Sequence, residues 1–558
     1  MQEIGGTKPV SVREIRIESL PFSSIPSQNK LFLDYLADPV SLGRFYPSAV
    51  DRPIDIEGRL EEVLANYHTD RERLCNALVG INSSFQASDA TLANIELLRE
   101  RDTVAILTGQ QTGLFTGPLY SIYKALSAIK MAECLRQRGV KAVPVFWMAT
   151  EDHDLEEVSN AFAIGSGGEL VEAKLDEAKN PGKPVGSVHF TDSIIEVAGR
   201  FIDALPGTEF TAELKSEIDR QWKPGAGFGS AFGTMLTQLL GKYGLIVVDP
   251  LDEAIKGLAA PIYASAIEKS ESIVAALTAR GNELAATGYA AQVLVEDDYF
   301  PLFYQTDDGR RAALRRNPDG SLQVKGERIR FSVEELIAVA ENDSSRLSPG
   351  VMLRPVVQDY LFPTLCYFGG GAEIAYFAQN SEVYRILGRS VTPILHRQSF
   401  TLVEAKHART LAAYGLEFTD LFAGEAAVLP ELVDKFIDPN TARLFGEAEE
   451  NINAELLRLD QALSDIDITL AANLATRRRK IVYHIGALRK KYQLRRAEKD
   501  EIIGRRVRAA FTALLPNGHL QERTLNIISY LDRLGTGFVD TVYDSIDLDD
   551  KGHRLIYL

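Results

Sequence analysis

The segment between residues 103 and 148 constrains the fold of this chain more than any other part of its sequence. A short apolar run, TVAILTG, leads into the loop QQTGLFTGP, and a helical pattern follows before a second apolar run, KAVPVFWMAT. A strand, a glycine-rich loop, a helix and a further strand make up the βαβ unit of a parallel sheet. The sequence therefore predicts an α/β protein with a doubly wound core.

The sequence on either side of this unit divides the chain into four parts. Apolar residues near the start have helical spacing, and a second helix-then-strand pattern, FGTMLTQLLGKYGLIVVDP, extends the core. Between residues 290 and 335, alternating residues with Asp-Gly turns predict a small antiparallel insertion. The expected parts are a mostly helical segment at 1–100, the catalytic core at 101–390 with that insertion, a helical coiled-coil domain at 391–515 and a tail at 516–558 that packs back on the core.

A long helical pattern begins near Ala442. Its apolar residues recur at alternating steps of four and three positions, which is the spacing of a coiled coil. A basic band at 477–480, 489–491 and 495–496 fits either a solvated face or a surface that binds a nucleotide or an acidic partner. The coiled coil either joins two subunits or folds back on itself. The recurring positions are Ile452, Leu456, Leu459, Leu463, Ile466 and Leu470, and after an offset Ile481, Ile485, Leu488 and Tyr492.

Composition argues against several classes of function. The formal net charge is -16, whereas nucleic-acid-binding surfaces are basic, so we expect no nucleic-acid partner. No apolar run approaches the roughly 20 residues needed to cross a bilayer, and the start has no signal-peptide pattern. Cys75, Cys134 and Cys366 are far apart and odd in number, which is typical of a reducing compartment. We therefore expect a soluble cytoplasmic protein with no membrane partner.

The loop after the first strand is the first candidate site. Free backbone N–H groups at the start of a helix attract anions, and glycines let a ligand approach the backbone closely. The loop is neither a dinucleotide fingerprint nor a Walker loop, because no Gly-Lys-Ser/Thr follows its glycines. A strand-to-helix turn capped by threonines is the alternative. The candidate substrate-binding residues are Gly109, Gln110, Gln111, Thr112, Gly113, Thr116, Gly117 and, within the helix, Lys124.

Four ionisable residues, Glu151, Asp152, His153 and Asp154, directly follow the second strand. In open α/β sheets, ligands bind at the carboxyl ends of strands, where these residues lie. Crowded carboxylates repel one another unless a cation, an amine or a shared proton relieves them, so we predict that the four residues serve catalysis or bind substrate. The alternative is a solvated loop that caps the next helix, which accounts for Asp154 but poorly for His153. We expect no metal, because no second histidine or cysteine pair has ligand spacing.

The third candidate is the stretch from Ser348 to Asn380. It places charged and amide groups among strongly apolar residues, where an unpaired charge is costly. Such groups either pair with one another or surround a pocket, and the triple glycine at 369–371 again permits close approach of the backbone. Arg354 is suited to bind a carboxylate through two parallel hydrogen bonds. The candidate residues are Arg354, Gln358, Asp359, Gly370, Glu373 and Tyr376.

These three stretches resemble the cysteine-adding enzymes of bacillithiol biosynthesis, the cysteine ligase family. TGQQTGLFTGPLYSIYKA, WMATEDHDLEEV and SPGVMLRPVVQDYLFPTLCYFGGGAEIAYFAQ are similar to that family's most characteristic segments, and the likeness spans nearly the full length, including the coiled coil. The stretch GGGAEIAYF departs from the family, in which a glycine-proline pair precedes the glutamate. The resemblance implies a Rossmann-like core with inserted segments and a helical coiled-coil domain that forms a homodimer.

The resemblance also implies a reaction, in which cysteine is joined to the amino group of glucosaminyl-malate to make the thiol bacillithiol. Forming an amide from a free carboxylate requires activation, most simply with ATP and Mg²⁺ as cosubstrate, and no tightly bound cofactor is implied. The glycine loop and Lys124 would then hold phosphate or carboxylate oxygens, and Arg354 would anchor a malate carboxylate. One residue of 151–154 would bind the ammonium, and His153 would remove its proton as general base.

Two other functions stay open at this point. One is a different nucleotide-dependent ligase or nucleotidyltransferase on the same fold, which acts on another amine. The layout resembles class I aminoacyl-tRNA synthetases, but the loop has no HIGH and the chain has no KMSKS. The other is a non-catalytic assembly protein that works through its coiled coil. The polar clusters at the strand ends favour an enzyme, because a retired site has no reason to tolerate their cost.

Overall fold

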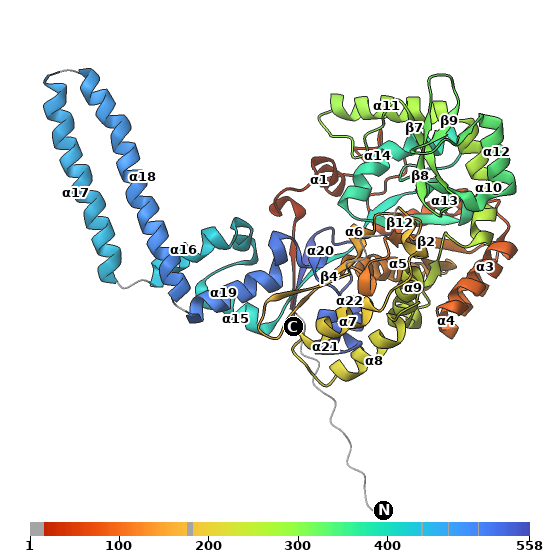
Figure 1. The fold of residues 1–558 in the computed structure, drawn as a ribbon, viewed down its shortest axis with the longest axis horizontal. Coiled ribbons are helices and arrows are strands. Elements are labelled where there is room, and N and C mark those ends of the chain that lie inside the picture. The colour runs from red at the N-terminus through yellow and green to blue at the C-terminus, as the bar shows by residue number, and fades with distance from the viewer. Residues whose placement is uncertain (1–15, 176–181, 437–438, 467, 500) are drawn as a thin grey trace, which may run out of the picture. The chain divides into compact units, whose positions relative to one another are not determined.

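The computed structural model describes residues 16–175, 182–436, 439–466, 468–499 and 501–558. They form two compact units (Figure 1). The first contains residues up to Thr401 together with Gln521–Ile556, and the second contains Leu402–Leu520 with the last two residues. No helix in the described ranges is both long enough and apolar enough to cross a membrane.

The core of the first unit is a parallel five-stranded sheet in the order β13-β12-β2-β3-β6. β2 (Val104–Gln110) and β3 (Ala142–Met148) are the two apolar runs of the βαβ unit, and α5 (Tyr120–Gln137) connects them. Every residue of β3 is buried, which is why it reads as a continuous apolar run. The doubly wound α/β prediction is confirmed. The other strands are β6 (Ile246–Val248), β12 (Thr364–Gly369) and β13 (Ile394–His396).

The strand order places a crevice at the centre of this sheet. The chain adds β3 and β6 on one side of β2, and later adds β12 and β13 on its other side. Ligands of doubly wound sheets bind where the order reverses, at the carboxyl ends of the strands. The expected site therefore lies between the ends of β2 and β12, at Gln110 and Gly369.

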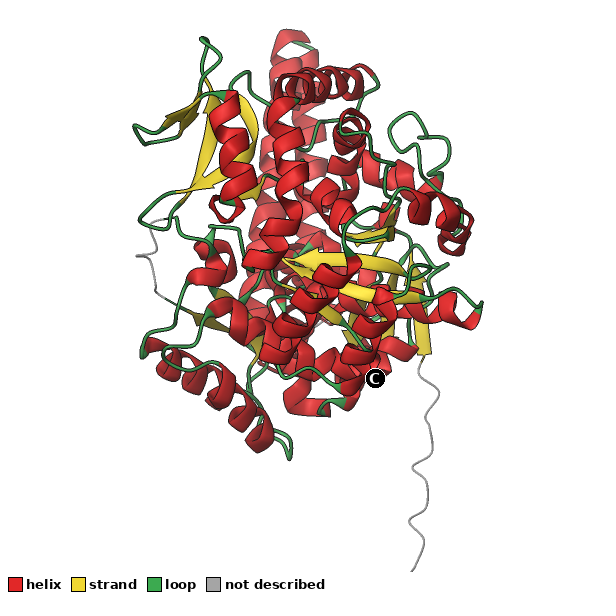
Figure 2. Cartoon of the chain, turned by 90° about the vertical axis from the view of Figure 1, so that its right-hand side faces the viewer, coloured by secondary structure: helices red, strands yellow, loops and turns green. Residues whose placement is uncertain are grey.

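Helices pack around the parallel sheet of this unit (Figure 2). α5 packs on β2 and β3, whereas α3 (Arg71–Ser84) packs on β6 and α4 (Asp89–Arg99) on β3 and β6. One hydrophobic cluster joins Leu135 of α5 to Ile106 of β2 and Phe368 of β12. Further helices are α1 (Lys30–Ala37), α2 (Leu60–Ala65), α6 (Leu155–Val158), α7 (Ser193–Asp203), α8 (Thr211–Gln221), α9 (Phe228–Leu240), α10 (Glu253–Glu268), α11 (Ser270–Ala286), α12 (Val333–Asn342), α13 (Arg354–Leu361) and α14 (Gly371–Ile386).

A second sheet, which is antiparallel, follows α11 in the chain and has the order β10-β9-β8-β7-β11. Two of its turns contain Asp-Gly pairs, and Gly309 and Gly320 both have a φ of 83°, which favours glycine at such turns. This sheet includes the segment in which the sequence predicts an antiparallel insertion. Its strands are β7 (Tyr299–Gln305), β8 (Arg311–Arg316), β9 (Leu322–Val324), β10 (Arg330–Phe331) and β11 (Leu347–Pro349).

The segment Gln521–Ile556 is part of the first unit. In this segment, Leu525 O accepts a hydrogen bond of 2.9 Å from the backbone N–H of Leu119, and Asn526 forms a β-bridge with Pro118. The end of the chain thus packs on the loop that precedes α5. The segment contains the helices α20 (Gln521–Thr524), α21 (Ile528–Leu534) and α22 (Gly537–Asp544). A small three-stranded sheet has the order β1-β15-β14, and its strands are β1 (Arg16–Leu20), β15 (His553–Tyr557) and β14 (Ser399–Val403).

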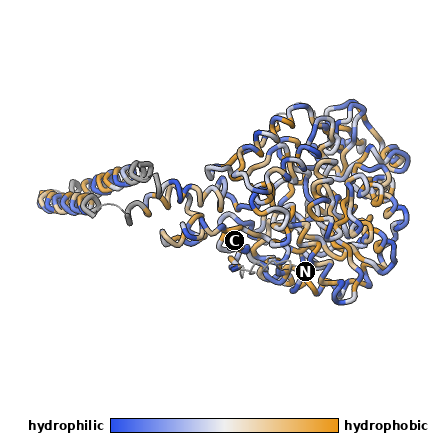
Figure 3. Tube along the Cα trace, turned by 90° about the horizontal axis from the view of Figure 1, so that it is seen from below, coloured by the Kyte–Doolittle hydropathy of each residue, from blue (hydrophilic) through white to orange (hydrophobic). Residues whose placement is uncertain are grey.

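The second unit contains two long helices, α17 (Pro439–Ser464) and α18 (Ile468–Lys499), which pack on each other. Asn453 accepts a hydrogen bond of 3.1 Å from Arg478 Nε across the pair. The coiled-coil pattern therefore folds back on itself within one chain. Figure 3 shows apolar and polar residues mixed along both helices.

Several apolar side chains of this helix pair stay exposed, among them Leu457, Ile466 and Leu488. The side chains of Leu470 and of residues 495–496, which the heptad pattern and the basic band include, lie outside the described part of the structure. The unit also contains α15 (Ala405–Tyr414), α16 (Glu425–Phe436) and α19 (Glu501–Leu514).

Candidate active site

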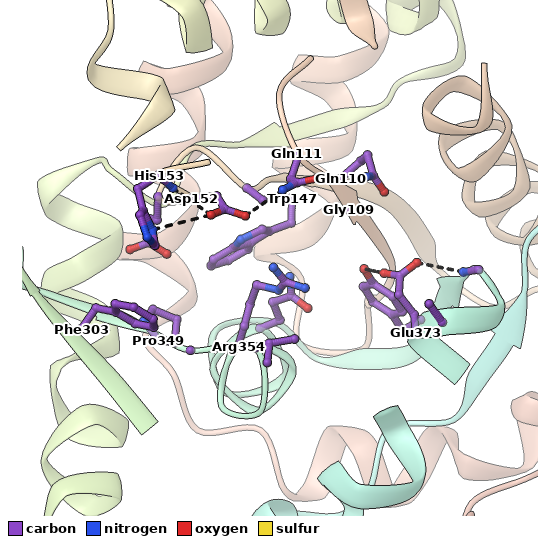
Figure 4. Close-up of a pocket in the computed structure, with 18 of the residues that line it drawn as sticks. Gly109, Gln110, Gln111, Trp147, Asp152, His153, Phe303, Pro349, Arg354 and Glu373 are labelled. Carbon is purple, nitrogen blue, oxygen red and sulfur yellow. Dashed lines mark hydrogen bonds and ion pairs between the residues drawn. The ribbon is translucent and has the colours of Figure 1, made fainter. Parts of the chain in front are cut away.

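A cavity of about 520 Å³ opens at the carboxyl ends of β2, β3 and β12 (Figure 4). This volume is within the range of small-molecule sites. The loops after β2 and β3 and the segment from β11 to α14 line it, and the antiparallel sheet adds a further wall. The sequence-predicted residues in its lining are Gly109, Gln110, Gln111, Lys124, Glu151, Asp152, His153, Arg354, Gln358, Gly370 and Glu373.

The loop after β2 is fastened to β3 and to the loop that follows β3. A Cβ on Gly109 would lie 2.7 Å from Trp147 O, so the neighbouring strand leaves space for glycine only. The side-chain amide of Gln111 donates to Asp152 Oδ2 and to Glu157 Oε2, both at 2.8 Å. Gln111 therefore positions the carboxylate of Asp152.

Lys124 of α5 is buried and links β2 to the first turn of α14. Its Nζ lies 2.6 Å from Glu373 Oε2 and donates to Gly109 O at 2.5 Å. Glu373 also accepts hydrogen bonds of 2.8 Å from the Tyr367 hydroxyl and the Gly370 N–H. Burial works against ionisation of Glu373, but Lys124 and these donors keep its pKa below the usual range. The charge of Lys124 is therefore already compensated by Glu373.

The second half of the glycine loop is buried outside the cavity lining. Phe115 and Thr116 have φ angles of 52° and 76°, which are unusual for residues other than glycine. The side-chain nitrogen of Asn526 lies 2.8 to 3.1 Å from the carbonyl oxygens of residues 114, 115 and 117, and so secures this conformation. The predicted contact residues in this buried half are Thr112, Gly113, Thr116 and Gly117.

Glu151 takes part in a buried ion pair. Its Oε1 lies 2.7 Å from Lys256 Nζ of α10, and the two side chains are only 6% and 4% exposed. Lys256 also donates to Leu347 O of β11 at 2.6 Å. The pair therefore ties the loop after β3 to α10 and β11.

Asp152 and Asp154 have different surroundings although they are close in sequence. Burial works against ionisation of Asp152, but the hydrogen bond from Gln111 and the charge of Arg311 keep its pKa below the usual range. Asp152 thus presents an ionised carboxylate at the cavity. Asp154 is exposed and accepts a hydrogen bond of 3.2 Å from the Glu157 N–H. It caps α6 and lies outside the cavity lining.

His153 is in contact with the antiparallel sheet. Its Nδ1 lies 3.2 Å from Arg311 NH1 of β8. The Cζ atom of Arg311 lies 3.7 Å from the centre of the Phe303 ring of β7. Arg311 also donates to Ser348 Oγ at 2.8 Å and to Pro349 O at 2.9 Å, both in β11. The inserted sheet therefore supplies a cation that the sequence analysis did not identify as part of the site.

A group of hydrogen-bond donors lines the part of the cavity around Arg354, where Figure 4 also shows Trp147. Arg354 donates to the Tyr376 hydroxyl at 3.3 Å, and no carboxylate in the described ranges forms an ion pair with it. The Nε2 of Gln358 and the Nε1 of Trp147 are buried without a partner among the described residues, and both residues are 2% exposed. Unpaired buried donors are costly. An oxygen-rich anion in the cavity would satisfy these donors.

Asp359 lies in a different place from its neighbour Gln358. Its Oδ2 accepts hydrogen bonds of 2.9 and 2.7 Å from Arg389, and its Oδ1 accepts one of 3.1 Å from Thr392. These contacts belong to structural ion pairing away from the cavity, which was the alternative interpretation for this stretch.

Arg397 and Arg523 line the cavity near the start of α14. Arg397 donates to both carboxylate oxygens of Glu522, at 3.0 and 2.7 Å, while the Arg523 side chain is exposed. At the N-terminus of α14, the Gly370 N–H donates to the Glu373 carboxylate at 2.8 Å. Within the described ranges, no three His, Cys, Asp or Glu side chains are grouped to hold a metal ion.

Comparisons with known proteins agree with this architecture. Residues 15–398 match the family described as "Bacillithiol biosynthesis BshC, N-terminal Rossmann-like domain", and residues 400–558 match "Bacillithiol biosynthesis BshC, C-terminal coiled-coil domain". The chain belongs to the BshC family. Similar relatives in Koribacter versatilis and Salinibacter ruber are both named "Putative cysteine ligase BshC". The first is 34% identical over 97% of this chain and 99% of the relative, and the second 33% identical over 94% and 96%.

Membership of the BshC family confirms the resemblance that the three sequence stretches indicated. Sequence reasoning did not identify Lys256, Phe303 or Arg311, which lie more than 100 residues after the loop that they contact. Arg311 belongs to the run RRAALRR, whose charges have no distinctive spacing. A usable signal was the Asp-Gly turn just before it, which predicts a hairpin but does not say which loop the hairpin contacts.

Proposed function

We propose that this chain is a cysteine ligase that joins the carboxyl group of cysteine to the amino group of glucosaminyl-malate, forming bacillithiol. The names of its relatives and the description of its family support this assignment. The observation that carries the proposal is that a single cavity combines the ionised carboxylate of Asp152 with the guanidinium of Arg354, which forms no ion pair with a carboxylate of the described residues. Both substrates of the proposed reaction carry an ammonium and at least one carboxylate.

Asp152 would bind a substrate ammonium group. Its carboxylate is ionised and is oriented by Gln111, and Glu151 is neutralised by Lys256. Asp152 is therefore the better placed of the two for a new cation, because Glu151 already has one.

Arg354, Gln358 and Trp147 would bind a malate carboxylate. Guanidinium groups bind carboxylates through paired, charge-assisted hydrogen bonds. The two buried donors beside Arg354 have no partner in the part of the chain that the structure describes. A dicarboxylate would satisfy all three residues and would explain why an α/β core tolerates their burial.

The carboxyl group of cysteine must be activated before an amine attacks it, and the proposed cosubstrate is ATP with Mg²⁺. Attack of the carboxylate on the α-phosphorus would give the acyl-adenylate and release diphosphate. Attack of the neutral sugar amine would then form the amide and release AMP and a proton. The exposed side chain of Arg523, which lines the same cavity, supports binding of phosphate oxygens there.

Two further parts of the proposal concern the whole protein. The exposed apolar residues of α17 and α18, such as Leu457 and Leu488, support a homodimer formed through this helix pair. The three unpaired cysteines support a reducing compartment such as the cytoplasm.

Mass spectrometry of purified protein with cysteine and glucosaminyl-malate, with and without ATP, tests the proposal. Bacillithiol formed only with ATP, together with AMP, is the expected result, and ADP instead of AMP would indicate an acyl-phosphate. Asp152→Asn and Arg354→Met should abolish or strongly reduce product, whereas Lys242→Met, which changes an exposed ion pair, should not. No product with any nucleotide, with the protein shown to be folded, would contradict the assignment.

A second candidate is ligation of cysteine to another amine. The donors around Arg354 favour a substrate with a carboxylate, so amino sugars that lack one should be poor substrates. Equal turnover of glucosamine and glucosaminyl-malate would favour this second candidate.

A further inference from the structure

The contacts of His153 determine which of its ring nitrogens carries a proton. Nδ1 has two charged neighbours, Arg311 NH1 at 3.2 Å and Asp152 Oδ1 at 3.8 Å. The carboxylate distance is beyond hydrogen-bond range. An arginine can only donate, so Nδ1 must accept, and in the neutral ring the proton lies on Nε2.

Arg311 cannot easily leave this position. Its Nε and NH2 groups are bonded to Ser348 and Pro349 of β11, and its planar group stacks over Phe303 of β7. The hydrogen bonds to Ser348 and Pro349 use Nε and NH2, so NH1 is the group that faces His153. The inserted sheet thus presents a fixed donor to the imidazole, and the guanidinium functions as a positioning group.

We propose that His153 acts as a neutral hydrogen-bond donor, through Nε2–H, to the carboxyl oxygen of the amino-acid substrate, and not as the general base. A general base needs a free lone pair, but Nδ1 is engaged by Arg311 and Nε2 holds a proton. Within the described part of the chain, the structure gives Nε2 no partner, and His153 lines the cavity. This inference rests on the proposed function and assigns a substrate group to the site.

Asp152 supports the same placement of the substrate. An α-amino acid carries an ammonium and a carboxylate on one carbon, so it needs an acceptor and a donor close together. Asp152 and His153 are adjacent, and the backbone N–H of His153 donates to Asp152 Oδ1 at 2.8 Å. The pair therefore offers a carboxylate for the ammonium and an N–H for the carboxyl oxygen.

The electrostatics of the ring agree with a neutral donor. Burial and the charge of Arg311 lower the pKa of His153, while Asp152 and Asp154 oppose this shift. Arg311, Asp152 and Asp154 are the charged groups that act on the His153 ring. Phe303 of β7, which also lies beside the ring, is uncharged. His153 is therefore neutral at pH 7, and its contact with Arg311 then leaves the single ring proton on Nε2.

Three substitutions of His153 separate the donor role from the base role. Glutamine places an amide N–H near the position of Nε2, whereas asparagine places its amide near Nδ1, and neither can act as a base. We expect His153→Ala and His153→Asn to lower kcat/KM by about 10²-fold or more, as loss of an oxyanion donor does. His153→Gln should stay within about tenfold of the unchanged protein, because it keeps the donor. Equal loss in the glutamine and alanine variants would overturn the donor role.

Nitrogen NMR of the histidine-labelled, full-length protein tests the tautomer without any ligase assay, with the His153 signal assigned by its absence in His153→Gln. The unchanged protein should show a proton on Nε2 alone at pH 7. In Arg311→Met the pKa of His153 should rise and the tautomers should mix. Arg310→Met is the matched control, because Arg310 carries the same charge one residue earlier and pairs with Asp308 and Glu327 instead.

The two kinds of measurement keep the inference distinct from the proposed function. A proton on Nδ1 in the unchanged protein would overturn the inference, whether or not Arg311→Met folds. An Nε2–H tautomer in a protein that makes no bacillithiol would sustain the position of the proton and remove the cysteine ligase assignment. In the active enzyme, a kcat/KM that does not fall as His153 becomes protonated supports the donor, and a fall that follows its pKa supports the base.

Discussion

Replacing Lys256 with methionine should destabilise the first unit far more than the loss of an ordinary surface charge. The Lys256–Glu151 pair has an N···O distance of 2.7 Å, and its side chains are 4% and 6% exposed. Removing one partner of a buried ion pair costs about 3–5 kcal/mol, because the other charge stays buried without compensation. Lys256→Met also leaves the carbonyl of Leu347 without its 2.6 Å donor. We therefore expect a loss of about 3–5 kcal/mol in the free energy of unfolding.

A second substitution should recover part of that stability. Glu151→Gln replaces the stranded carboxylate by a neutral amide, whose burial costs much less than that of a charge. The double variant Lys256→Met/Glu151→Gln should therefore be more stable than Lys256→Met alone, by about 2 kcal/mol. Lys242→Met is the control, since its ion pair with Asp540 is about half exposed and such pairs contribute about 0–1 kcal/mol.

Urea unfolding followed by intrinsic fluorescence measures these differences. The two tryptophans, Trp147 and Trp222, are both buried in the first unit, so fluorescence reports on that unit. The electrostatic reasoning is refuted if Lys256→Met costs no more than Lys242→Met, or if the double variant is no more stable than Lys256→Met.

Three further predictions concern other contacts of the first unit. Arg354→Met should raise the KM for glucosaminyl-malate about 10- to 100-fold in steady-state assays, since hydrogen bonds to charged groups contribute about 1.5–3 kcal/mol; an unchanged KM would place the malate elsewhere. Asn526→Ala should cost about 1–3 kcal/mol in urea unfolding, because three loop carbonyls lose their common donor. Burial lowers the pKa of His553 to about 4, so the unfolded state binds the extra proton and stability should fall as pH drops from about 6.5 to 4, by about 3 kcal/mol. His553→Gln should flatten that part of the curve of urea midpoint against pH, and an unchanged slope would contradict this origin.

The sequence predicts the local parts of the core but not their order in the sheet. The run from 103 to 148 contains β2, α5 and β3 in succession, joined by short loops, so its apolar spacing reveals all three elements. That β12 joins the other side of β2 depends on pairing between strands more than 250 residues apart. No spacing in a single sequence carries that information, and the crevice at the centre of the sheet depends on it.

The glycine loop shows where composition misleads about a site. Its first half, Gly109 to Gln111, lines the cavity, whereas its second half is buried. A loop of glycines and threonines has the same composition whether a ligand or another part of the chain satisfies its backbone. Asn526, some 400 residues later, takes the position that a ligand would occupy at the second half. Only the tertiary structure separates these two cases.

The loop after β3 gives the most general lesson about how this cavity acquires its chemistry. Each of its three ionisable residues in the lining is controlled by a partner from another element: Lys256 neutralises Glu151, Gln111 orients Asp152, and Arg311 fixes the proton of His153. The residue types at 151–153 are compatible with acid, base, binding or structural roles. The partner of each residue determines which of these roles it has. Because those partners lie on α10, the β2 loop and β8, a substitution far from residues 151–153 can change their chemistry while the loop sequence stays the same.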